Sequence, residues 1–331
     1  MQKTIAAVVV TYNRKVLLGN CLNALLSQTR LPEMVYVIDN ASTDGTGDHI
    51  KELGYLENPR VCYVPLSENL GGAGGFRNGM ETASRDGYDF LWIMDDDAEP
   101  RLDALERMMP FVSQEHVSAI ANLKVDPDGT PQIFHLGTIR WNPFVDLVKP
   151  LTAKDYENKQ YLDIQFSSFV GLLISKCAIE KIGLPRTDFY IHADDFEYCV
   201  RLNEVGKIVL VPDSVVVHNS PRPVQARKRF LMLTAVPDTF KASCFRYFGE
   251  RNSTWVVKNY SPIGWLGAVL YAAKRMVKRA VKVTIFEHDH YWTRLYVLFR
   301  GYMDGLTSNF DNAFPTKVFS AKMNPKGREL Q

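Results

Sequence analysis

The sequence predicts an α/β fold with a mostly parallel central sheet, followed by a helical C-terminal region. Three observations lead to this prediction. Residues 4–10 form a continuous apolar run rich in β-branched side chains, strand-like and helix-like patterns alternate through residue 100, and residues 236–331 combine helical spacing with many basic and aromatic side chains. A chain of 331 residues that is 46% hydrophobic can bury a large domain and a smaller unit, which we place at residues 1–235 and 236–331.

The first predicted unit is a strand, a helix and a second strand. The run at residues 4–10 has the composition of a strand that is buried on both faces of a parallel sheet. Apolar side chains at helical spacing follow through Leu25, and residues 34–38 form the next strand-like run. Strand, helix and strand within about forty residues predict a right-handed crossover unit. Its strands would end at Thr11 and Asp39.

Two more strands are predicted at residues 61–64 and 90–94, with a glycine-rich turn and a helix at about residues 75–85 between them. In such sheets ligands bind at the carboxyl ends of the strands. Thr11, Asp39 and Asp95 all occupy such ends, so we expect one site to collect all three. Further along, residues 205–217 predict a β-hairpin that is followed by His218.

The acidic run Asp95-Asp96-Asp97 directly follows an apolar strand. Three carboxylates held so close together repel one another unless a cation is present. Hard divalent ions prefer carboxylate oxygens and keep positions open for phosphate, so Mg²⁺ or Mn²⁺ shared with a diphosphate is the expected occupant. A solvated acidic turn is the alternative.

Two loops offer polar groups to a ligand. Asp39 and the neighbouring Asn40 could pair with the edge of a base, and the glycine-rich residues 68–76 enter a helix whose free N–H groups could approach phosphate or sugar oxygens. Neither GxGxxG nor GxxxxGK[ST] fits this loop, which argues against a dinucleotide-binding fold and a P-loop. A purely structural glycine turn is the alternative.

Carboxylates also cluster at the predicted start of a helix in residues 191–198. Asp194, Asp195 and Glu197 lie where the helix N-terminus stabilises anions, and one of them could accept a proton from an attacking hydroxyl. Helix capping is the simpler interpretation. His218 ends an apolar strand, and a lone histidine in that position is more often structural than a ligand.

Taken in order, the motifs Thr11-Tyr12-Asn13-Arg14, residues 39–45 and Asp95-Asp96-Asp97 resemble the inverting family 2 glycosyltransferases, over about residues 4–255. The resemblance implies a GT-A fold, in which about residues 1–100 bind a nucleotide-sugar donor and about residues 101–235 carry the acceptor site and the base.

The resemblance also implies roles around the donor. Thr11, Tyr12 and Asp39 would surround the nucleotide base, and Asp95 would lie near the ribose or the metal. Asp97, His218 and Asp95 would hold Mn²⁺ or Mg²⁺. The full implied donor site is Thr11, Tyr12, Asn13, Arg14, Asp39, Asn69, Gly72, Gly74, Asp95 and Asp96.

By the same resemblance Asp195 would be the general base, with Asp194 as its rival, since the family often has Glu-Asp where this chain has Asp-Asp. His192, Asp194 and Glu197 are candidates to bind the acceptor. A metal and backbone dipoles would stabilise the departing diphosphate while the base activates an acceptor hydroxyl on the opposite face of the sugar. Inversion at the anomeric carbon is the expected outcome.

A narrower resemblance links residues 69–76 and 247–252 to bacterial galactofuranosyltransferases, with rhamnosyltransferases next. It implies transfer of galactofuranose from UDP-galactofuranose to a lipid-linked or cell-surface glycan. Two alternatives stay open, a rhamnosyltransferase that uses dTDP-rhamnose and a catalytically silent nucleotide-sugar-binding protein.

The C-terminal part is strongly basic, because residues 222–331 hold 19 of the 39 lysines and arginines but 7 of the 37 acidic residues. Within it, residues 265–283 predict an amphipathic helix of the kind that lies in an anionic membrane interface. Packing on the catalytic domain with a solvated basic face is the alternative. The apolar positions are Leu266, Val269, Leu270, Ala273, Met276, Val277, Ala280 and Val281. The basic positions opposite them are Lys274, Arg275, Lys278, Arg279 and Lys282.

The remaining signals concern location and partners. Five widely spaced cysteines without a CxxC pair indicate neither a disulfide framework nor a zinc ribbon and favour a reducing cytosol. No export signal is visible, and the longest uncharged stretch, residues 259–273, is too short to span a bilayer. We therefore expect a cytoplasmic protein bound peripherally to the inner face of the cell membrane. The acidic front part argues against nucleic acid as a partner.

Overall fold

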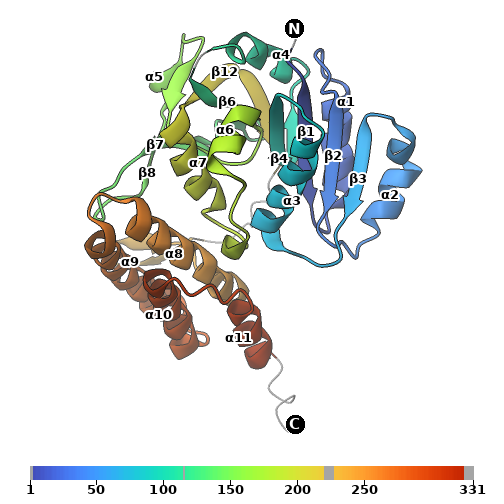
Figure 1. Ribbon diagram of the computed structural model, residues 1–331. Coiled ribbons are helices and arrows are strands. Elements are labelled where there is room, and N and C mark those ends of the chain that lie inside the picture. Colours follow the sequence, from blue (N-terminus) through green and yellow to red (C-terminus); the bar gives the residue numbers. More distant parts are fainter. Residues whose placement is uncertain (1–2, 115, 220–226, 324–331) are drawn as a thin grey trace. The chain divides into compact units, whose positions relative to one another are not determined.

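The computed structural model describes residues 3–114, 116–219 and 227–323, and it divides into two compact units (Figure 1). The first unit runs through Ile139, resumes at Val148–Thr187 and begins its last segment at Asp194. The second unit contains the C-terminal helices together with two short segments from earlier in the chain, Arg140–Leu147 and Asp188–Ala193.

The first unit is built on a nine-stranded sheet of order β3-β2-β1-β4-β11-β6-β12-β5, with β9 paired to β12. Four pairs are parallel, β1 with β2, β1 with β4, β2 with β3, and β6 with β12, and β11 runs antiparallel to β4 and β6. The strands are β1 (Ile5–Thr11), β2 (Met34–Asp39), β3 (Val61–Pro65), β4 (Phe90–Asp95), β5 (Ala98–Pro100), β6 (Val117–Val125), β9 (Leu162–Ile164), β11 (Leu172–Ser175) and β12 (Lys207–His218).

Helices cover this sheet (Figure 1), and a small sheet of order β10-β7-β8 lies beside it. The helices are α1 (Lys15–Leu26), α2 (Thr46–Glu52), α3 (Gly71–Arg85), α4 (Ala104–Met108), α5 (Ala153–Tyr156), α6 (Lys176–Ile182) and α7 (Asp194–Val205). The small sheet contains β7 (Leu136–Ile139), β8 (Val148–Pro150) and β10 (Phe166–Ser167). Short 3₁₀ turns lie at Tyr55–Glu57, Met109–Phe111, Ile133–His135 and Thr187–Phe189.

The core explains why the opening run is apolar throughout. Every residue of β1 is buried, as are residues 90–94 of β4, because the two strands are paired on both edges and covered on both faces. Leu18 and Leu22 of α1 belong to the same core cluster as Trp92. The Trp92 indole Nε1 donates to the carbonyl of Gly171 at 3.0 Å, which satisfies its buried polar atom.

The prediction of a hairpin at residues 205–217 was wrong. These residues form the single strand β12, which runs parallel to β6 on both sides of an irregularity between Val211 and Val215. The residues between them, which include Pro212, bulge out of the strand and do not reverse it. The bulge lets β12 continue to His218, which pairs with Ala98 of β5.

Helix α3 begins at Gly71, four residues before its predicted start, so the glycines form its first turn. Two of its glycines allow it to lie close to the sheet. A Cβ on Gly75 would lie 2.5 Å from Val10 Cγ1, and a Cβ on Gly79 would lie 2.3 Å from Val8 Cγ1. The sequence GGAGG therefore serves close helix-to-sheet packing as well as the loop.

We expect Gly79→Ala to lower the free energy of unfolding by about 1–3 kcal/mol, because the added methyl has no room against Val8 and Ile38. Gly72→Ala is the matched control: a Cβ added there would have nothing within 4 Å, so helix propensity should leave stability unchanged or raise it by up to about 1 kcal/mol. Urea unfolding of both variants checks this, and equal stabilities would contradict the packing argument.

The second unit is helical, with a short hairpin. Its elements are α8 (Phe240–Tyr260), α9 (Gly264–Phe286), α10 (Tyr291–Thr307), α11 (Phe314–Met323) and the strands β13 (Lys228–Phe230) and β14 (Leu233–Ala235). Helix α8 packs against α9, α10 and α11. Tyr247 and Phe248 of α8, Val297 of α10 and Phe314 of α11 form one apolar cluster. Within the described residues, no helix is both long and apolar enough to cross a membrane.

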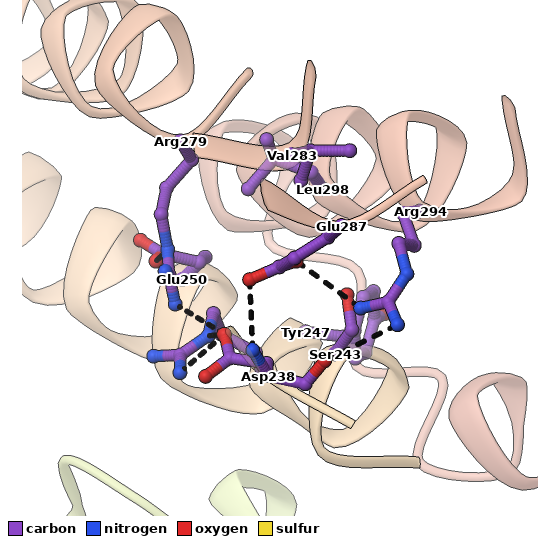
Figure 2. Close-up of a pocket in the computed structure, with 10 residues that line it drawn as sticks. Asp238, Ser243, Tyr247, Glu250, Arg279, Val283, Glu287, Arg294 and Leu298 are labelled. Carbon is purple, nitrogen blue, oxygen red and sulfur yellow. Dashed lines mark hydrogen bonds and ion pairs between the residues drawn. The ribbon is translucent and has the colours of Figure 1, made fainter. Parts of the chain in front are cut away.

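Helix α9 is amphipathic as predicted, but part of its basic side packs inward. Arg275, Arg279 and Lys282 turn toward acidic side chains of their own unit, as Figure 2 shows for Arg279. Arg275 Nε lies 3.2 Å from Glu250 Oε2, and Lys282 Nζ lies 3.3 Å from Glu287 Oε1. Because the two glutamates are buried, they need these counter-charges. The prediction of one continuous exposed basic face was therefore wrong for these three residues.

Candidate functional site

The carboxyl ends of β1, β2 and β4 meet at one edge of the sheet. Thr11 is in register with Asp39, and Val10 is in register with Asp95, so the strand ends lie next to one another. The sequence predicted this convergence from where each apolar run stops. The acidic run and the Asp39 loop therefore border the same region of the first unit.

Asp96 is buried, and its side chain holds the end of the first strand, β1. Thr11 Oγ1 donates to Asp96 Oδ2 at 2.6 Å, and Arg14 Nη1 lies 3.3 Å from Asp96 Oδ1. Burial raises the pKa of Asp96 to about 6, although Thr11 and Arg14 act in the opposite direction. Asp96 therefore holds the Thr11 and Arg14 loop in place, and its carboxylate is already engaged.

Asp97 is the member of the run with an available oxygen. Its Oδ2 lies 2.7 Å from Arg14 Nη1, whereas its Oδ1 is buried and has no hydrogen-bond partner among the described residues. His218 Nε2 lies 3.3 Å from this Oδ1, which is ion-pair distance without hydrogen-bond geometry. Burial alone would raise the pKa of Asp97, but His218 and Arg14 outweigh it and lower the pKa.

Gln132 fixes the imidazole of His218. The Gln132 amide nitrogen donates to Asp126 Oδ1 at 2.7 Å and to the carbonyl of His218 at 3.2 Å, so its oxygen is an acceptor. That oxygen lies 2.7 Å from His218 Nδ1, which must then carry a proton. In the neutral ring the Nε2 lone pair therefore faces Asp97 Oδ1. A proton on Nε2 would pair His218 with Asp97 directly, and a metal ion shared by the Nε2 lone pair and Asp97 Oδ1 would also fit.

The predicted set of three metal ligands is only partly assembled. Asp97 and His218 come together, but no group of three or more His, Cys, Asp or Glu side chains in the described part of the chain is arranged to hold a metal. Asp95 was the third predicted ligand. Its pKa is raised well above its ordinary value, first by burial and then by Asp97, Asp96 and Asp194. A hard cation would complete its coordination with oxygens that the two protein ligands do not supply, such as those of a diphosphate.

The Asp39 loop is held by its own motif and by Tyr63, which the sequence did not single out. Asp39 Oδ1 accepts from the backbone N–H of Ser42 at 2.8 Å, and Oδ2 accepts from the hydroxyl of Tyr63. Asn40 bridges to the glycine-rich loop, since its side chain donates to the carbonyl of Gly71 and accepts from the N–H of Leu70, each at 2.9 Å. The two loops therefore form one connected edge.

Asn13 joins the first loop to the second. It adopts a φ of 55°, and its side-chain oxygen accepts from the N–H of Thr43 at 2.7 Å, so its role in the structure is to support the loop. Tyr12 beside it is 44% exposed and remains available to stack on a base. In the third loop Asn69 accepts from the N–H of Gly71, and Gly72 and Gly74 lie in the first turn of α3.

Asp194 and Asp195 begin α7, as the sequence predicted, and share one electrostatic environment. Burial raises the pKa of both; Asp195 adds to the shift of Asp194, whereas Lys124 opposes the shift of Asp195. Lys124 is itself fully buried, and its Nζ donates to Ser167 Oγ at 2.6 Å. Burial lowers the pKa of Lys124 to about 7. A carboxylate with a raised pKa is suited to accept a proton near neutral pH.

Glu197 is less suited to bind an acceptor than the sequence indicated. It is 1% exposed, and its carboxylate lies 2.7 Å from Arg201 Nη2 within α7. Arg201 in turn donates to the carbonyl of Ile182 at 2.7 Å. Glu197 therefore serves the packing of α7, and His192 and Asp194 remain the acceptor candidates.

In the second unit, the motif at residues 247–252 holds the segment that precedes α7. Asn252 Nδ2 donates to the carbonyls of Phe189 at 2.9 Å and His192 at 2.8 Å. Arg251 Nη2 donates to the carbonyl of Asp188 at 2.9 Å. Arg251 and Asn252 are fully buried, so these bonds define the path of the chain from Asp188 to His192 within the second unit.

We expect Asn252→Ala to cost about 1–3 kcal/mol of unfolding free energy, because the carbonyl of His192 loses its donor and the carbonyl of Phe189 loses one of its donors. We also expect kcat to fall more than KM rises, since the chain leading into Asp194 loses its support. Asn259→Ala is the matched control, because that exposed side chain on the same helix donates to the carbonyl of Trp255 within its own helix. Urea unfolding measures the stability of each variant, and steady-state kinetics measure its kcat and KM. Equal stability and equal kinetic constants in the two variants would refute the role assigned to Asn252.

The sequence profile of glycosyl transferase family 2 matches residues 6–183, which include all three strand ends. The chain belongs to this family. The resemblance read from the motifs is thereby confirmed, and the fold is that of the GT-A glycosyltransferases. It is similar to a mannosyltransferase, PcManGT from Pyrobaculum calidifontis, whose structure was solved with GDP-Man and Mn²⁺: the TM-score is 0.52 at 16% identity, covering 93% of this chain and 88% of that one.

Two curated relatives are similar in sequence. Galactofuranosyltransferase GlfT1 of Mycobacterium tuberculosis is 31% identical over 211 residues, which is 62% of this chain and 66% of the relative, just under two thirds of its length. The dTDP-rhamnosyl transferase RfbF of Shigella flexneri is 23% identical over 266 residues, which is 80% of this chain and 83% of the relative. Both sugar classes expected from the motifs are therefore represented among the relatives.

Proposed function

We propose that this chain is an inverting glycosyltransferase that uses a nucleotide-sugar donor and a divalent cation. The observation that carries the proposal is the buried pair of Asp97 Oδ1 and His218 Nε2, two groups that can ligate a divalent ion and lie near the ends of the strands β1, β2 and β4. Membership of glycosyl transferase family 2 supports the reaction class.

Asp97 and His218 fit Mn²⁺ or Mg²⁺, with Asp95 nearby on the same run. When bound, the ion would neutralise the negative charge that develops on the leaving diphosphate. Arg14 lies 2.7 Å from Asp97 and adds a fixed positive charge on the same side. PcManGT, which shares the fold, was solved with GDP-Man and Mn²⁺, and that supports a metal in the donor site.

The donor would lie along the connected edge of the three loops. Tyr12 and Asp39 would contact the base. The backbone N–H groups of Gly72 and Gly74, in the first turn of α3 next to Asn69, would approach the diphosphate or sugar. Asn13 and Asp96 support these loops through their hydrogen bonds.

Asp195 would accept the proton of the acceptor hydroxyl as the hydroxyl attacks the anomeric carbon on the face opposite the leaving diphosphate. Its raised pKa supports this assignment. Asp194 shares the environment and remains the rival base. His192, two residues before Asp194, would then contact the acceptor.

The donor sugar we propose is galactofuranose from UDP-galactofuranose, with a lipid-linked or cell-surface glycan as acceptor. Similarity to GlfT1 supports this choice, and the longer match to RfbF keeps dTDP-rhamnose as the second candidate. We further propose that the protein acts in the cytoplasm, on the inner face of the cell membrane, where such acceptors are assembled on lipid.

A panel of UDP- and dTDP-sugars, incubated with the purified protein with Mn²⁺ or with EDTA, tests the proposal through nucleotide release. We expect release from UDP-galactofuranose with Mn²⁺ and none with EDTA. Preference for dTDP-rhamnose would select the second candidate. Nucleotide binding without release from any donor, also in the presence of extracted glycolipid, would indicate a catalytically silent nucleotide-sugar-binding protein.

A further inference from the structure

The side of α9 that the sequence predicted to be apolar lies on the surface of the second unit. Leu266 is 59% exposed, Val277 63% and Val281 46%. The residues of α9 that pack inward are on the other side of the helix, among them Tyr271 and Ala272. The helix therefore turns a row of large apolar side chains to the outside, while its internal contacts include the ion pairs of Arg275, Arg279 and Lys282 described above.

Helix α10 exposes a second apolar row. Trp292 is 79% exposed, Tyr296 and Phe299 are each 50% exposed, and Met303 is 39% exposed. The four follow one another at spacings of four, three and four residues, which places them on one side of the helix. No charged residue interrupts this row.

The two rows belong to neighbouring helices. Helices α9 and α10 pack on each other through Ala272, Leu298 and Tyr302, with Met276 beside them. Thr284 Oγ1 of α9 lies 3.1 Å from the hydroxyl of Tyr291 at the start of α10. We call the outward rows of the two helices, with Lys274 and Lys278, the α9/α10 surface.

The exposed charges on the helices of this surface are basic, while the exposed Asp289 between α9 and α10 pairs with Arg294. Helix α9 contains no acidic residue, and its exposed charges are Lys274 and Lys278. The one acidic residue of α10, Asp304, is buried and accepts from Arg300 and Tyr247. Helix α11 adds the exposed Lys317 and Lys322 and no acid. The pattern is complementary to an anionic partner, and it would repel a second copy of the same surface.

We propose that the α9/α10 surface is the part of the protein that enters the interface of an anionic lipid bilayer. This inference rests on the proposed function for its purpose, because it would bring the enzyme to a lipid-linked acceptor. Large apolar side chains would enter the acyl boundary, the rings of Trp292 and Tyr296 suit the headgroup level, and the lysines would contact anionic headgroups. Exposed apolar rows of this size would otherwise be costly in water.

The test is co-sedimentation of the full-length protein with vesicles of phosphatidylcholine alone and of phosphatidylcholine mixed with phosphatidylglycerol. We expect binding to the anionic vesicles that weakens with added salt. The double variant Val277→Glu/Trp292→Glu should lose this binding. Lys274→Glu/Lys278→Glu should weaken it about thirtyfold or more, since each lysine near an anionic surface contributes about 1 kcal/mol.

Matched controls come from exposed positions of the first unit. Leu102→Glu replaces a leucine that is 60% exposed, and Lys181→Glu reverses an exposed lysine, so both should bind vesicles like the wild type. Circular dichroism checks that all variants fold. Equal binding by wild type and the Val277→Glu/Trp292→Glu variant, or no binding of the wild type to either vesicle, would overturn the inference. The inference would also be overturned if the wild type were a dimer and the Val277→Glu/Trp292→Glu variant dissociated it.

Nucleotide release from a soluble donor separates this inference from the proposed function. Surface variants should release nucleotide at the wild-type rate in the absence of vesicles. A protein that binds anionic vesicles through this surface but releases no nucleotide would leave the inference standing and refute the proposed activity.

Discussion

Replacing Asp97 with alanine is expected to abolish metal-dependent turnover, with a loss of about a thousandfold or more in kcat. The variant removes the carboxylate whose Oδ1 has no hydrogen-bond partner among the described residues and faces His218 Nε2. A bound divalent ion contributes several kcal/mol to stabilising a leaving diphosphate, so losing its ligand should cost that much. Nucleotide release as a function of Mn²⁺ concentration is the measurement.

Asp103→Ala is the control for Asp97→Ala. Asp103 lies six residues later, is partly exposed and forms an ion pair with Arg107 across one helical turn, so its loss should leave turnover unchanged. Asp97→Asn provides a second test. This variant keeps the size of the side chain, and its main structural loss is the contact with Arg14. Wild-type Mn²⁺ dependence in either Asp97 variant would show that the metal site lies elsewhere.

Asp195→Asn is expected to keep donor binding and to lose transfer by about a hundred- to ten-thousandfold, the usual contribution of a general base. The amide preserves the shape of the side chain at the start of α7 but cannot accept a proton. Calorimetric titration with the donor nucleotide and steady-state transfer measure the two effects separately. Asp194→Asn is the matched comparison, since both residues share one buried environment.

The pH profile adds a second readout for the base. A carboxylate accepts a proton only when ionised, so kcat/KM should fall as the pH drops through the pKa of the base. Burial raises that pKa, and the acid limb should therefore lie well above the range of an ordinary aspartate, about pH 4. If Asp194→Asn lost transfer and Asp195→Asn did not, the role of base would pass to Asp194. Transfer at the wild-type rate in both Asp194→Asn and Asp195→Asn would refute a general base at this position.

The strand ends of the site were predictable because local pattern determines them. An apolar run that stops at Thr11, Asp39 or Asp95 shows where a buried strand ends, and parallel pairing then brings the ends together. Asp194 and Asp195 at the start of α7 follow from the same kind of local signal.

The groups that complete the site were not predictable, because they meet it only through long-range contacts. Gln132 is 86 residues from His218, and Lys124 is 43 residues from Ser167. Neither residue belongs to a motif, and no periodicity shows that they are buried. Tyr63, which donates to Asp39, looked like an ordinary strand residue in the sequence.

Helix α9 shows a second limit of structure prediction from periodic spacing. The pattern correctly separated an apolar from a basic side, but the spacing alone does not tell which side packs inward. That depended on the buried carboxylates of Glu250 and Glu287 and on the partly buried Asp238, which draw Arg275, Arg279 and Lys282 toward them. The hairpin prediction failed for a related reason, since Pro212 signals a break in a strand without saying whether the chain bulges or reverses.

The most direct test of the account is calorimetric titration of the wild-type protein with UDP in the presence of Mn²⁺ and in EDTA. We expect binding that depends on the metal, because the diphosphate would complete the coordination of an ion held by Asp97 and His218. UDP binding of equal strength in EDTA, or none under either condition with a fully folded protein, would contradict it.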